Sequence, residues 1–146
     1  MKVNVAKKTI AVIIIIISLF LMLSCFANAE DNPETRSLYY QRVESSAAIS
    51  STGLLSIQNY YFINSSAFTS AKISTYVERK VLGLFWVKVD NGQPNKTWVD
   101  YPTATMYNKQ YTLQLSQTGN YRVTVEYIFY GSYGSETITK QPTATY

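Results

Sequence analysis

Few side chains in this sequence could perform catalysis, and histidine is missing altogether. Without an imidazole there is no Ser-His or Cys-His nucleophilic pair, no imidazole general base and no histidine-ligated zinc. The single cysteine, Cys25, can form neither an internal disulfide nor a thiolate metal site. The sequence also lacks a nucleophile elbow, a phosphate-binding loop and a calcium-binding loop.

Two carboxylates are the remaining candidates for catalysis. Asp90 and Asp100 flank a predicted hairpin, and a pair of carboxylates can hydrolyse a glycosidic bond. Both lie in a turn or on an exposed strand face, where a solvated charge is the commoner role. We therefore expect that the protein is not an enzyme and uses no cofactor, and we assign no catalytic, cofactor-binding or metal-binding residue.

Aromatic side chains are the stronger candidates for function, since the chain has 13 tyrosines and 2 tryptophans. Tyrosine combines an apolar face with a polar tip, which suits a wet recognition surface. In Leu84–Val89 the alternation places Phe85, Val87 and Val89 toward the core. It places Trp86 on the outer face. The same alternation over Lys96–Tyr101 turns Trp98 outward. The alternative is that one or both indoles belong to the core, because large aromatic residues are usually mostly buried.

Three residues are therefore candidate binding residues: Trp86, Trp98 and Tyr133. Tyr133 lies in a glycine-rich turn, Gly131–Ser135. Two outward-pointing indoles would form a platform for a sugar ring or a protein surface. We expect the partner to be a cell-envelope glycan or a surface protein.

The first thirty residues have the composition of an export signal. Three lysines and no acid occupy Met1–Lys8, an apolar stretch follows over Thr9–Leu23, and Ala27–Ala29 has the small-residue pattern of a cleavage site. These three parts in this order are typical of a secretory signal peptide. We expect residues 1–29 to be removed before Glu30 and the mature protein to be secreted and extracellular.

Two alternatives to free secretion remain open. The uncharged stretch over residues 9–29 is long enough to cross a bilayer, which takes about 20 apolar residues, and would hold the domain outside as an uncleaved anchor. A lipid on Cys25 would anchor the mature chain instead. Otherwise Cys25 leaves with the leader, and we expect no stable membrane insertion of the mature protein.

The leader also accounts for most of the net charge. The whole chain has 13 Lys+Arg and 9 Asp+Glu, a net charge of +4. Removing the three lysines of the leader leaves 10 bases against 9 acids, a net charge of +1. This balance predicts no nucleic-acid binding and gives no support to adsorption on anionic membranes.

The exported part has the alternation of β-strands, and no segment sustains a helical apolar period. Apolar and polar residues alternate most clearly in Lys72–Lys80, Tyr107–Ser116 and Tyr121–Phe129. Asn91-Gly92 predicts a hairpin turn that joins Leu84–Val89 to a return strand over Lys96–Tyr101.

These segments predict an all-β protein built as a single antiparallel immunoglobulin-like β-sandwich. We count about seven strands over residues 49–146, at the spacing of roughly 8–12 residues that is typical of such sandwiches. Residues 30–48 have no clean period and are expected to form a flexible or partly ordered N-terminal arm. In the last strand, Glu136–Thr145, Pro142 suits only a sheet edge or a strand end.

One local motif supports the sandwich. The sequence Thr118–Val123 resembles the tyrosine corner of immunoglobulin-like domains, in which a tyrosine at the start of strand F bonds back to the preceding loop. The cysteine found two residues after that tyrosine in antibody domains is Val123 here.

The exported part as a whole resembles a largely uncharacterised group of small secreted β-sandwich proteins of Gram-positive bacteria. The resemblance implies the fold and export, and little about activity. The residues that carry it are Trp86, Val89, Gly119, Tyr121, Arg122, Val123, Val125 and Thr137–Thr139.

The function that the sequence favours is an extracellular binding or surface-interaction module. The alternative is a secreted effector, similar to a bacteriocin, that acts on another cell. A purely structural role in an extracellular assembly fits the same features, and an enzyme that depends on Asp90 or Asp100 ranks last.

Overall fold

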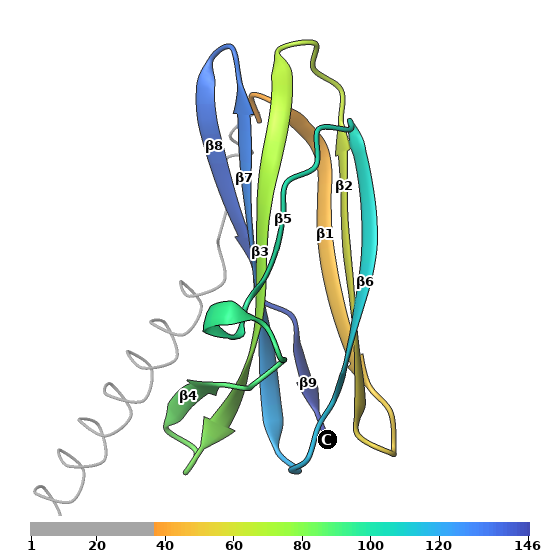
Figure 1. The fold of residues 1–146 in the computed structure, drawn as a ribbon, viewed down its shortest axis with the longest axis vertical. Helices are drawn as coiled ribbons and strands as arrows, with labels where there is room; N and C mark the ends of the chain where they lie inside the picture. The colour runs from red at the N-terminus through yellow and green to blue at the C-terminus, as the bar shows by residue number, and fades with distance from the viewer. Residues whose placement is uncertain (1–36) are drawn as a thin grey trace, which may run out of the picture. The chain divides into compact units, whose positions relative to one another are not determined.

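The computed structural model describes Ser37–Tyr146, which forms nine β-strands and one short 3₁₀ helix (Figure 1). The signal peptide expected over residues 1–29, including Cys25, lies outside the described residues. In chain order the elements are β1 (Tyr40–Ile49), β2 (Leu54–Ile63), β3 (Phe68–Val81), β4 (Phe85–Lys88), η1 (Pro94–Lys96), β5 (Trp98–Asp100), β6 (Met106–Gln114), β7 (Asn120–Gly131), β8 (Gly134–Lys140) and β9 (Thr143–Thr145).

The strands form two antiparallel sheets that pack face to face. One sheet has three strands in the order β1-β2-β6, and the other has six, in the order β4-β3-β7-β8 with β5 also on β3 and β9 also on β7. Strands β3, β7 and β8 share the larger sheet, as strands C, F and G do in an immunoglobulin-like sandwich. The predicted all-β sandwich is therefore confirmed.

Nine strands appear instead of about seven because β1 precedes the predicted strands and the last predicted strand, Glu136–Thr145, is divided into β8 and β9. Strands β8 and β9 follow one another along β7 in a single register, pairing Val125 with Lys140 and Arg122 with Thr143. Pro142 interrupts them, yet its carbonyl still accepts the Val123 N–H at 2.9 Å. Pro142 therefore lies on an edge strand, as its missing N–H requires.

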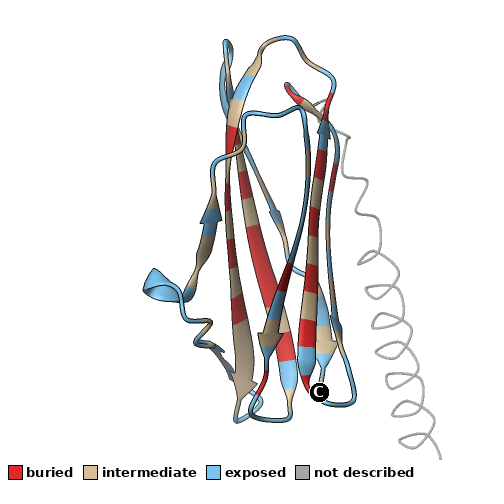
Figure 2. Cartoon of the chain, turned by 45° about the vertical axis from the view of Figure 1, so that its right-hand side comes forward, coloured by how far each residue is buried: buried red, intermediate tan, exposed pale blue. Residues whose placement is uncertain are grey.

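The predicted alternation holds in the longest strands. Tyr121, Val123, Val125, Tyr127 and Phe129 of β7 are all buried. Ile73, Thr75 and Val77 of β3 are likewise buried, and the buried bands of both strands lie between the two sheets (Figure 2).

Tyrosines form a large part of this core, which differs from the surface role expected for them. Five of the 13 tyrosines are buried, and each of their hydroxyls is hydrogen-bonded. The Tyr61 hydroxyl donates to the Ala104 carbonyl at 2.8 Å, and the Tyr127 hydroxyl donates to the Glu44 carbonyl at 2.9 Å. Because a buried phenol needs such a partner, these tyrosines fasten loops and opposing strands to the core. The buried tyrosines are Tyr39, Tyr61, Tyr111, Tyr121 and Tyr127.

The tyrosine corner is present. The Tyr121 hydroxyl donates to the carbonyl oxygen of Gln117, four residues upstream in the turn before β7. The ring is 2% exposed. The contact that the sequence motif implied is therefore confirmed.

Residues 30–48 were expected to form a flexible or partly ordered arm, but the described part of this range, from Ser37 onward, belongs to the ordered sandwich. Residues 30–36 lie outside the described part. Tyr40–Ile49 is strand β1, which pairs along its length with β2. Tyr39 is 2% exposed, and its hydroxyl donates to the Gly134 carbonyl at 3.0 Å. The inward positions of β1 include the small residues Ser45 and Ala47, and this is why the strand had no clear apolar period.

The hairpin predicted at Asn91-Gly92 is also wrong. Strands β4 and β5 do not pair with each other, because both pair with β3, where Glu78 opposes Lys88 and Thr75 opposes Trp98. The tight turn lies instead at Leu82–Leu84, between β3 and β4. Strands β4 and β5 thus follow one another along one edge of β3 (Figure 1).

Candidate functional site

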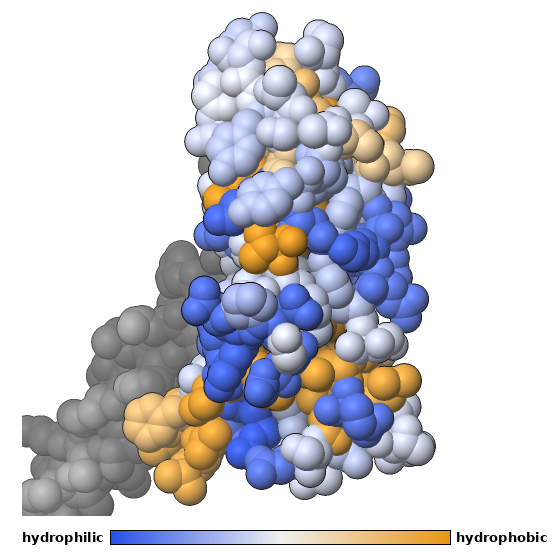
Figure 3. Space-filling model, in the orientation of Figure 1, coloured by the Kyte–Doolittle hydropathy of each residue, from blue (hydrophilic) through white to orange (hydrophobic). Residues whose placement is uncertain are grey.

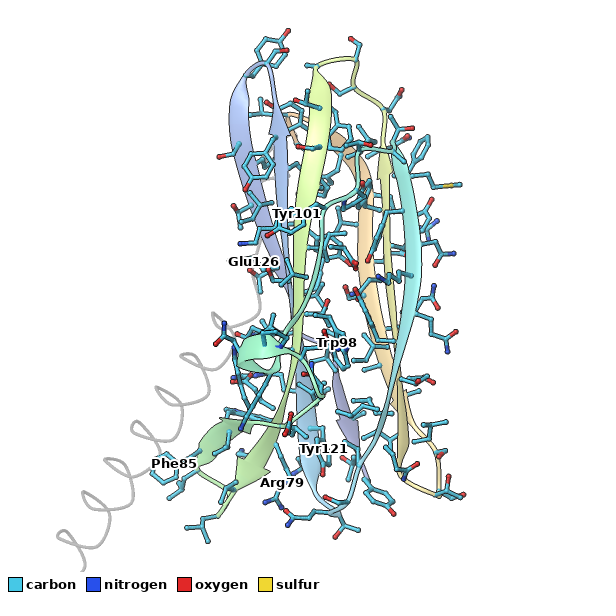
Figure 4. The ribbon with its side chains drawn as sticks, viewed as in Figure 1. Arg79, Phe85, Trp98, Tyr101, Tyr121 and Glu126 are labelled. Atoms are coloured by element: carbon cyan, nitrogen blue, oxygen red, sulfur yellow. The ribbon has the colours of Figure 1, made fainter. Side chains whose placement is uncertain are left out.

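Trp98 is half-buried and packs against the core of the sandwich, so its predicted outward orientation is wrong. Its indole stacks on the ring of Tyr111 in the opposite sheet, with centroids 4.9 Å apart and planes 23° apart. Figure 4 shows Trp98 on the side of β5 toward β6. The register explains this orientation, because Trp98 opposes Thr75, whose side chain is buried. Trp98 is therefore a structural residue and is not part of the candidate binding surface.

Asp100 lies beside this stack and is surrounded by donors. The Tyr107 hydroxyl donates to it at 2.7 Å, the Tyr111 hydroxyl also donates to it, and the Lys109 ammonium lies 2.5 Å away. Burial alone would raise the pKa of Asp100, but the hydrogen bonds from Lys109, Tyr111 and Tyr107 outweigh it and lower the pKa. Asp100 is therefore held as an anion that anchors β5 to β6.

Asp90 belongs to a different part of the structure. Its carboxylate accepts the Gly92 N–H at 3.0 Å and so closes a local turn. The two carboxylates considered for glycoside hydrolysis thus have separate partners, and the structure does not bring them together. Within Ser37–Tyr146, no group of three or more Asp, Glu, Cys or His side chains is arranged to hold a metal ion.

Trp86 faces outward on β4, as the alternation predicted. It opposes Lys80 of β3, and the guanidinium carbon of Arg122 lies 4.5 Å from its ring centroid. Arg122 is fixed there by an ion pair with Glu78, with 2.8 Å between Nη2 and the carboxylate oxygen. One face of the indole is thus covered by a cation, and the side chain is only half-buried. Trp86 does not offer the open platform for a sugar ring that the sequence suggested.

The most exposed apolar surface lies on the turn next to Trp86. The exposed fractions are 85% for Leu82, 74% for Leu84, 62% for Phe85 and 50% for Val87. Figure 3 shows this apolar cluster at the lower left, at the end of the domain where Figure 1 places β4. We call these four residues the hairpin tip.

Phe85 and Val87 were predicted to face the core, and this prediction is wrong. By register they oppose Val81 and Arg79, on the inner side of the larger sheet. They stay exposed because β4 is an edge strand that lies away from the three-stranded sheet (Figures 1 and 4). Only Val89, beyond the end of β4, packs against the core.

The backbone at the hairpin tip is unfavourable for its sequence. Leu82 has φ +52° and is followed by Gly83 with φ +70°. A left-handed conformation costs a non-glycine residue about 1–2 kcal/mol, and Asn or Asp tolerate it better than Leu. Because Leu82 is 85% exposed, burial within the domain does not offset this cost. An exposed leucine in a strained turn indicates a role outside the fold.

Basic side chains surround the hairpin tip. Arg79 and Lys80 precede it on β3, and Lys88 follows it on β4, with the Lys88 ammonium 4.0 Å from the ring centroid of Tyr76. The nearby Glu78 is paired with Arg122. This end of the domain is therefore locally basic.

Tyr133 lies elsewhere. It is 73% exposed in the turn between β7 and β8, at the opposite end of the domain from the β3–β4 turn (Figure 1). The structure therefore does not bring the three candidate binding residues together: Trp86 is beside the hairpin tip, Trp98 is inside the sandwich and Tyr133 is at the far end.

Sequence reasoning missed Leu82 and Leu84 as candidate binding residues. The signal that could have found them is the run Leu82–Val87, which is apolar except for Gly83 and is bracketed by Lys80 and Lys88. A glycine next to a leucine inside such a run marks a turn, and a turn places its side chains in solvent.

The comparisons with known proteins add no relative. No protein-family model matches the chain, and no curated protein matches its sequence. None of the helices in the described part is long and apolar enough to cross a membrane.

Proposed function

We propose that this chain is an exported, non-enzymatic module that binds a surface outside the cell through the β3–β4 hairpin. The observation that carries the proposal is the hairpin tip itself, with four exposed apolar side chains and a strained leucine at its turn. Exposed apolar residues gathered in one place are typical of an interaction site.

The energetics of the hairpin tip favour binding. Full burial of one Leu, Phe or Val side chain stabilises a complex by about 1.5–3 kcal/mol. Leu82, Leu84 and Phe85 are all more than half exposed, so most of this free energy is still available to a partner. The cations Lys80 and Lys88 beside the tip would steer an acidic partner toward it.

The electrostatics of the domain agree with a role without catalysis. Asp100 accepts hydrogen bonds from two tyrosines and Asp90 closes its own turn, so each carboxylate already has a structural partner. The first of the two expected partner classes, a glycan that stacks on Trp86, is the weaker one because Arg122 covers the indole.

The test uses protein recovered from the medium of cells that express the full chain. We expect its intact mass to begin at Glu30. Binding to isolated cell envelopes is compared for the wild type, the double variant Leu84→Ser/Phe85→Ser and the control Tyr133→Ser. The control removes a similarly exposed apolar side chain at the opposite end of the domain.

We expect the double variant to bind at least about tenfold more weakly, as the loss of two buried apolar side chains predicts. The control should bind like the wild type. Equal binding by the folded double variant contradicts the proposal, and loss of binding in the control alone moves the site to the β7–β8 turn. A mass that retains residues 1–29, or that includes a lipid on Cys25, contradicts free secretion and leaves the binding comparison intact.

A further inference from the structure

We infer that the surface bound by the hairpin tip is an anionic phospholipid bilayer, into which Leu82, Leu84 and Phe85 insert. This inference rests on the proposed binding function and names its ligand class. It describes shallow docking of one hairpin at the lipid headgroups, which differs from a membrane-spanning segment.

The shape of the tip favours lipid over a folded partner. A Cβ added at Gly83 would meet no atom within 4 Å, so the turn projects into open space. On either side of it, Leu82 and Leu84 are the two most exposed large apolar residues of the described chain. A protein partner would need a pocket shaped to this projection, whereas acyl chains adapt to it.

The cations lie at the depth that headgroups would occupy. Lys80 is two residues from Leu82, and Lys88 is four residues from Leu84. At about 3.3 Å per strand residue, their backbones lie roughly 7 and 13 Å from the apolar turn. Interfacial segments bury their apolar face roughly 5–10 Å deep, and basic side chains reach back to anionic headgroups. The spacing therefore matches a tip in the acyl region with Lys80 at the phosphates, while the Lys88 ammonium lies farther back, 4.0 Å from the Tyr76 ring centroid.

Trp86 fits the same arrangement. Its half-buried indole lies behind the tip, between the guanidinium of Arg122 at 4.5 Å and the ammonium of Lys80 at 5.8 Å, both measured to the ring centroid. Tryptophan is enriched at the boundary between acyl chains and headgroups because its ring is apolar and its N–H is polar. Trp86 can occupy this boundary even though Arg122 covers one face of its ring.

The net charge of +1 for the mature chain gave no support to adsorption on anionic membranes, whereas the local arrangement of charges at the tip does support it. A membrane senses charges within about one Debye length, which is about 8 Å at physiological ionic strength. Arg79, Lys80 and Lys88 are close to the tip, and the carboxylate of Glu78 is neutralised by Arg122. The attraction to an anionic membrane depends on where the charges lie, and the net charge of the whole chain does not determine it.

The experiment uses the full-length chain with vesicles that contain brominated phospholipids, which quench nearby tryptophan emission. A reporter is placed at the tip in the Leu84→Trp variant, and a matched reporter is placed at the far end in the Tyr133→Trp variant. The emission of the wild type is subtracted from both. Both variants keep residues 1–29, so they differ only in the position of the reporter. Unchanged thermal unfolding confirms that each exposed substitution leaves the fold intact.

In phosphatidylglycerol vesicles we expect the added emission of Leu84→Trp to fall by about half or more, since the tip lies in the acyl region. The emission of Tyr133→Trp should stay within error of its value without bromine. In phosphatidylcholine vesicles neither reporter should be quenched. The variant Lys80→Gln/Lys88→Gln, made in the Leu84→Trp background, should need about tenfold more anionic lipid for half-maximal quenching, whereas Lys140→Gln in that background should not.

Equal quenching of the two reporters, or equal quenching in the two lipids, overturns the inference. If Leu84→Trp is not quenched but Leu84→Ser/Phe85→Ser still loses binding to envelopes, the partner is a protein and the proposed binding function stands. If neither result is obtained, both the inference and the proposed function fail.

Discussion

The indole of Trp98 and the ring of Tyr111 stack 4.9 Å apart across the interior of the sandwich. Trp98 belongs to β5 in the larger sheet, and Tyr111 belongs to β6 in the smaller one. The Tyr111 hydroxyl continues the contact by donating to Asp100, two residues after Trp98. Strand β5 is only three residues long, so these side-chain contacts help to hold it against the smaller sheet.

The first prediction separates the two tryptophans. Trp98→Ala should lower the free energy of unfolding by about 3 kcal/mol, because it removes a large side chain packed on the core. Trp86→Ala should cost about 1 kcal/mol, since its loss is mainly a cation–π contact with Arg122 on an outer face. Urea unfolding of both variants measures the difference. Equal costs would contradict the assignment of Trp98 to the interior.

The second prediction concerns the tyrosine corner. Tyr121→Phe removes the hydroxyl that donates to the Gln117 carbonyl and leaves that acceptor without its partner. We expect a loss of about 1–2 kcal/mol in the free energy of unfolding. Tyr133→Phe changes the same group on a 73% exposed ring and should lie within about 0.5 kcal/mol of the wild type. A Tyr121→Phe variant as stable as that control would show that the contact has no energetic role.

Strict alternation over a long strand explains what the sequence predicted well. Strand β7 has 12 residues and large apolar side chains at every second position, so only one face can be buried. The edge role of Pro142 and the corner at Tyr121 were likewise readable, because each depends on the chemistry of one residue. These features sufficed for the fold class.

Short strands explain what the sequence could not predict. The inward face of β5 is set by its register on β3, where Thr75 opposes Trp98, and three residues contain no period that reveals this. The apolar Val99 suggested the opposite face, yet it is 42% exposed. The exposure of the hairpin tip could not be predicted for a related reason. Phe85 and Val87 alternate with polar or outward residues as in a core strand. They are exposed because β4 lies at the edge of the sheet. The burial of a tyrosine is also hard to predict, because its apolar ring suits a core and its hydroxyl suits a surface.

The third prediction is an acid dependence centred on Asp100. Hydrogen bonds from Lys109, Tyr111 and Tyr107 outweigh burial and lower the pKa of this carboxyl in the folded state. A carboxylate with a lowered pKa stabilises the fold fully above its unfolded pKa of about 3.9, and this stabilisation is lost as the pH falls through the folded-state pKa. Asp100→Asn should be about 2 kcal/mol less stable at neutral pH and should lose less stability than the wild type as the pH falls below about 4.

The matched control for this prediction is Asp90→Asn, which removes a carboxylate that accepts only a local turn N–H. This variant keeps the Asp100 cluster, so it should retain the acid dependence that the cluster contributes. Thermal unfolding at several pH values compares the three proteins. An acid profile of Asp100→Asn that matches the wild type would contradict the ionised cluster.

The fourth prediction is an alkaline dependence that comes from the buried tyrosines. Burial raises the pKa of Tyr61 to about 12 and that of Tyr127 to about 12. Unfolded tyrosine ionises near pH 10, so the stabilisation by the neutral phenols is complete below that pH and is lost as the pH rises through the folded-state pKa. The free energy of unfolding should therefore fall between about pH 10 and pH 12, and Tyr127→Phe should fall less steeply there. A wild-type profile that stays flat through this range would contradict the buried hydroxyls.

The most direct test of the central claim, that the β3–β4 hairpin is kept for binding and not for the fold, is the envelope affinity of the Leu82→Asn variant. Asparagine tolerates the φ of +52° at this position, so the variant should unfold with a free energy equal to the wild type or about 1 kcal/mol higher. We predict that its affinity for isolated envelopes is at least about tenfold weaker, because one apolar side chain of the tip is lost. An affinity equal to that of the wild type, with the fold intact, would contradict the account.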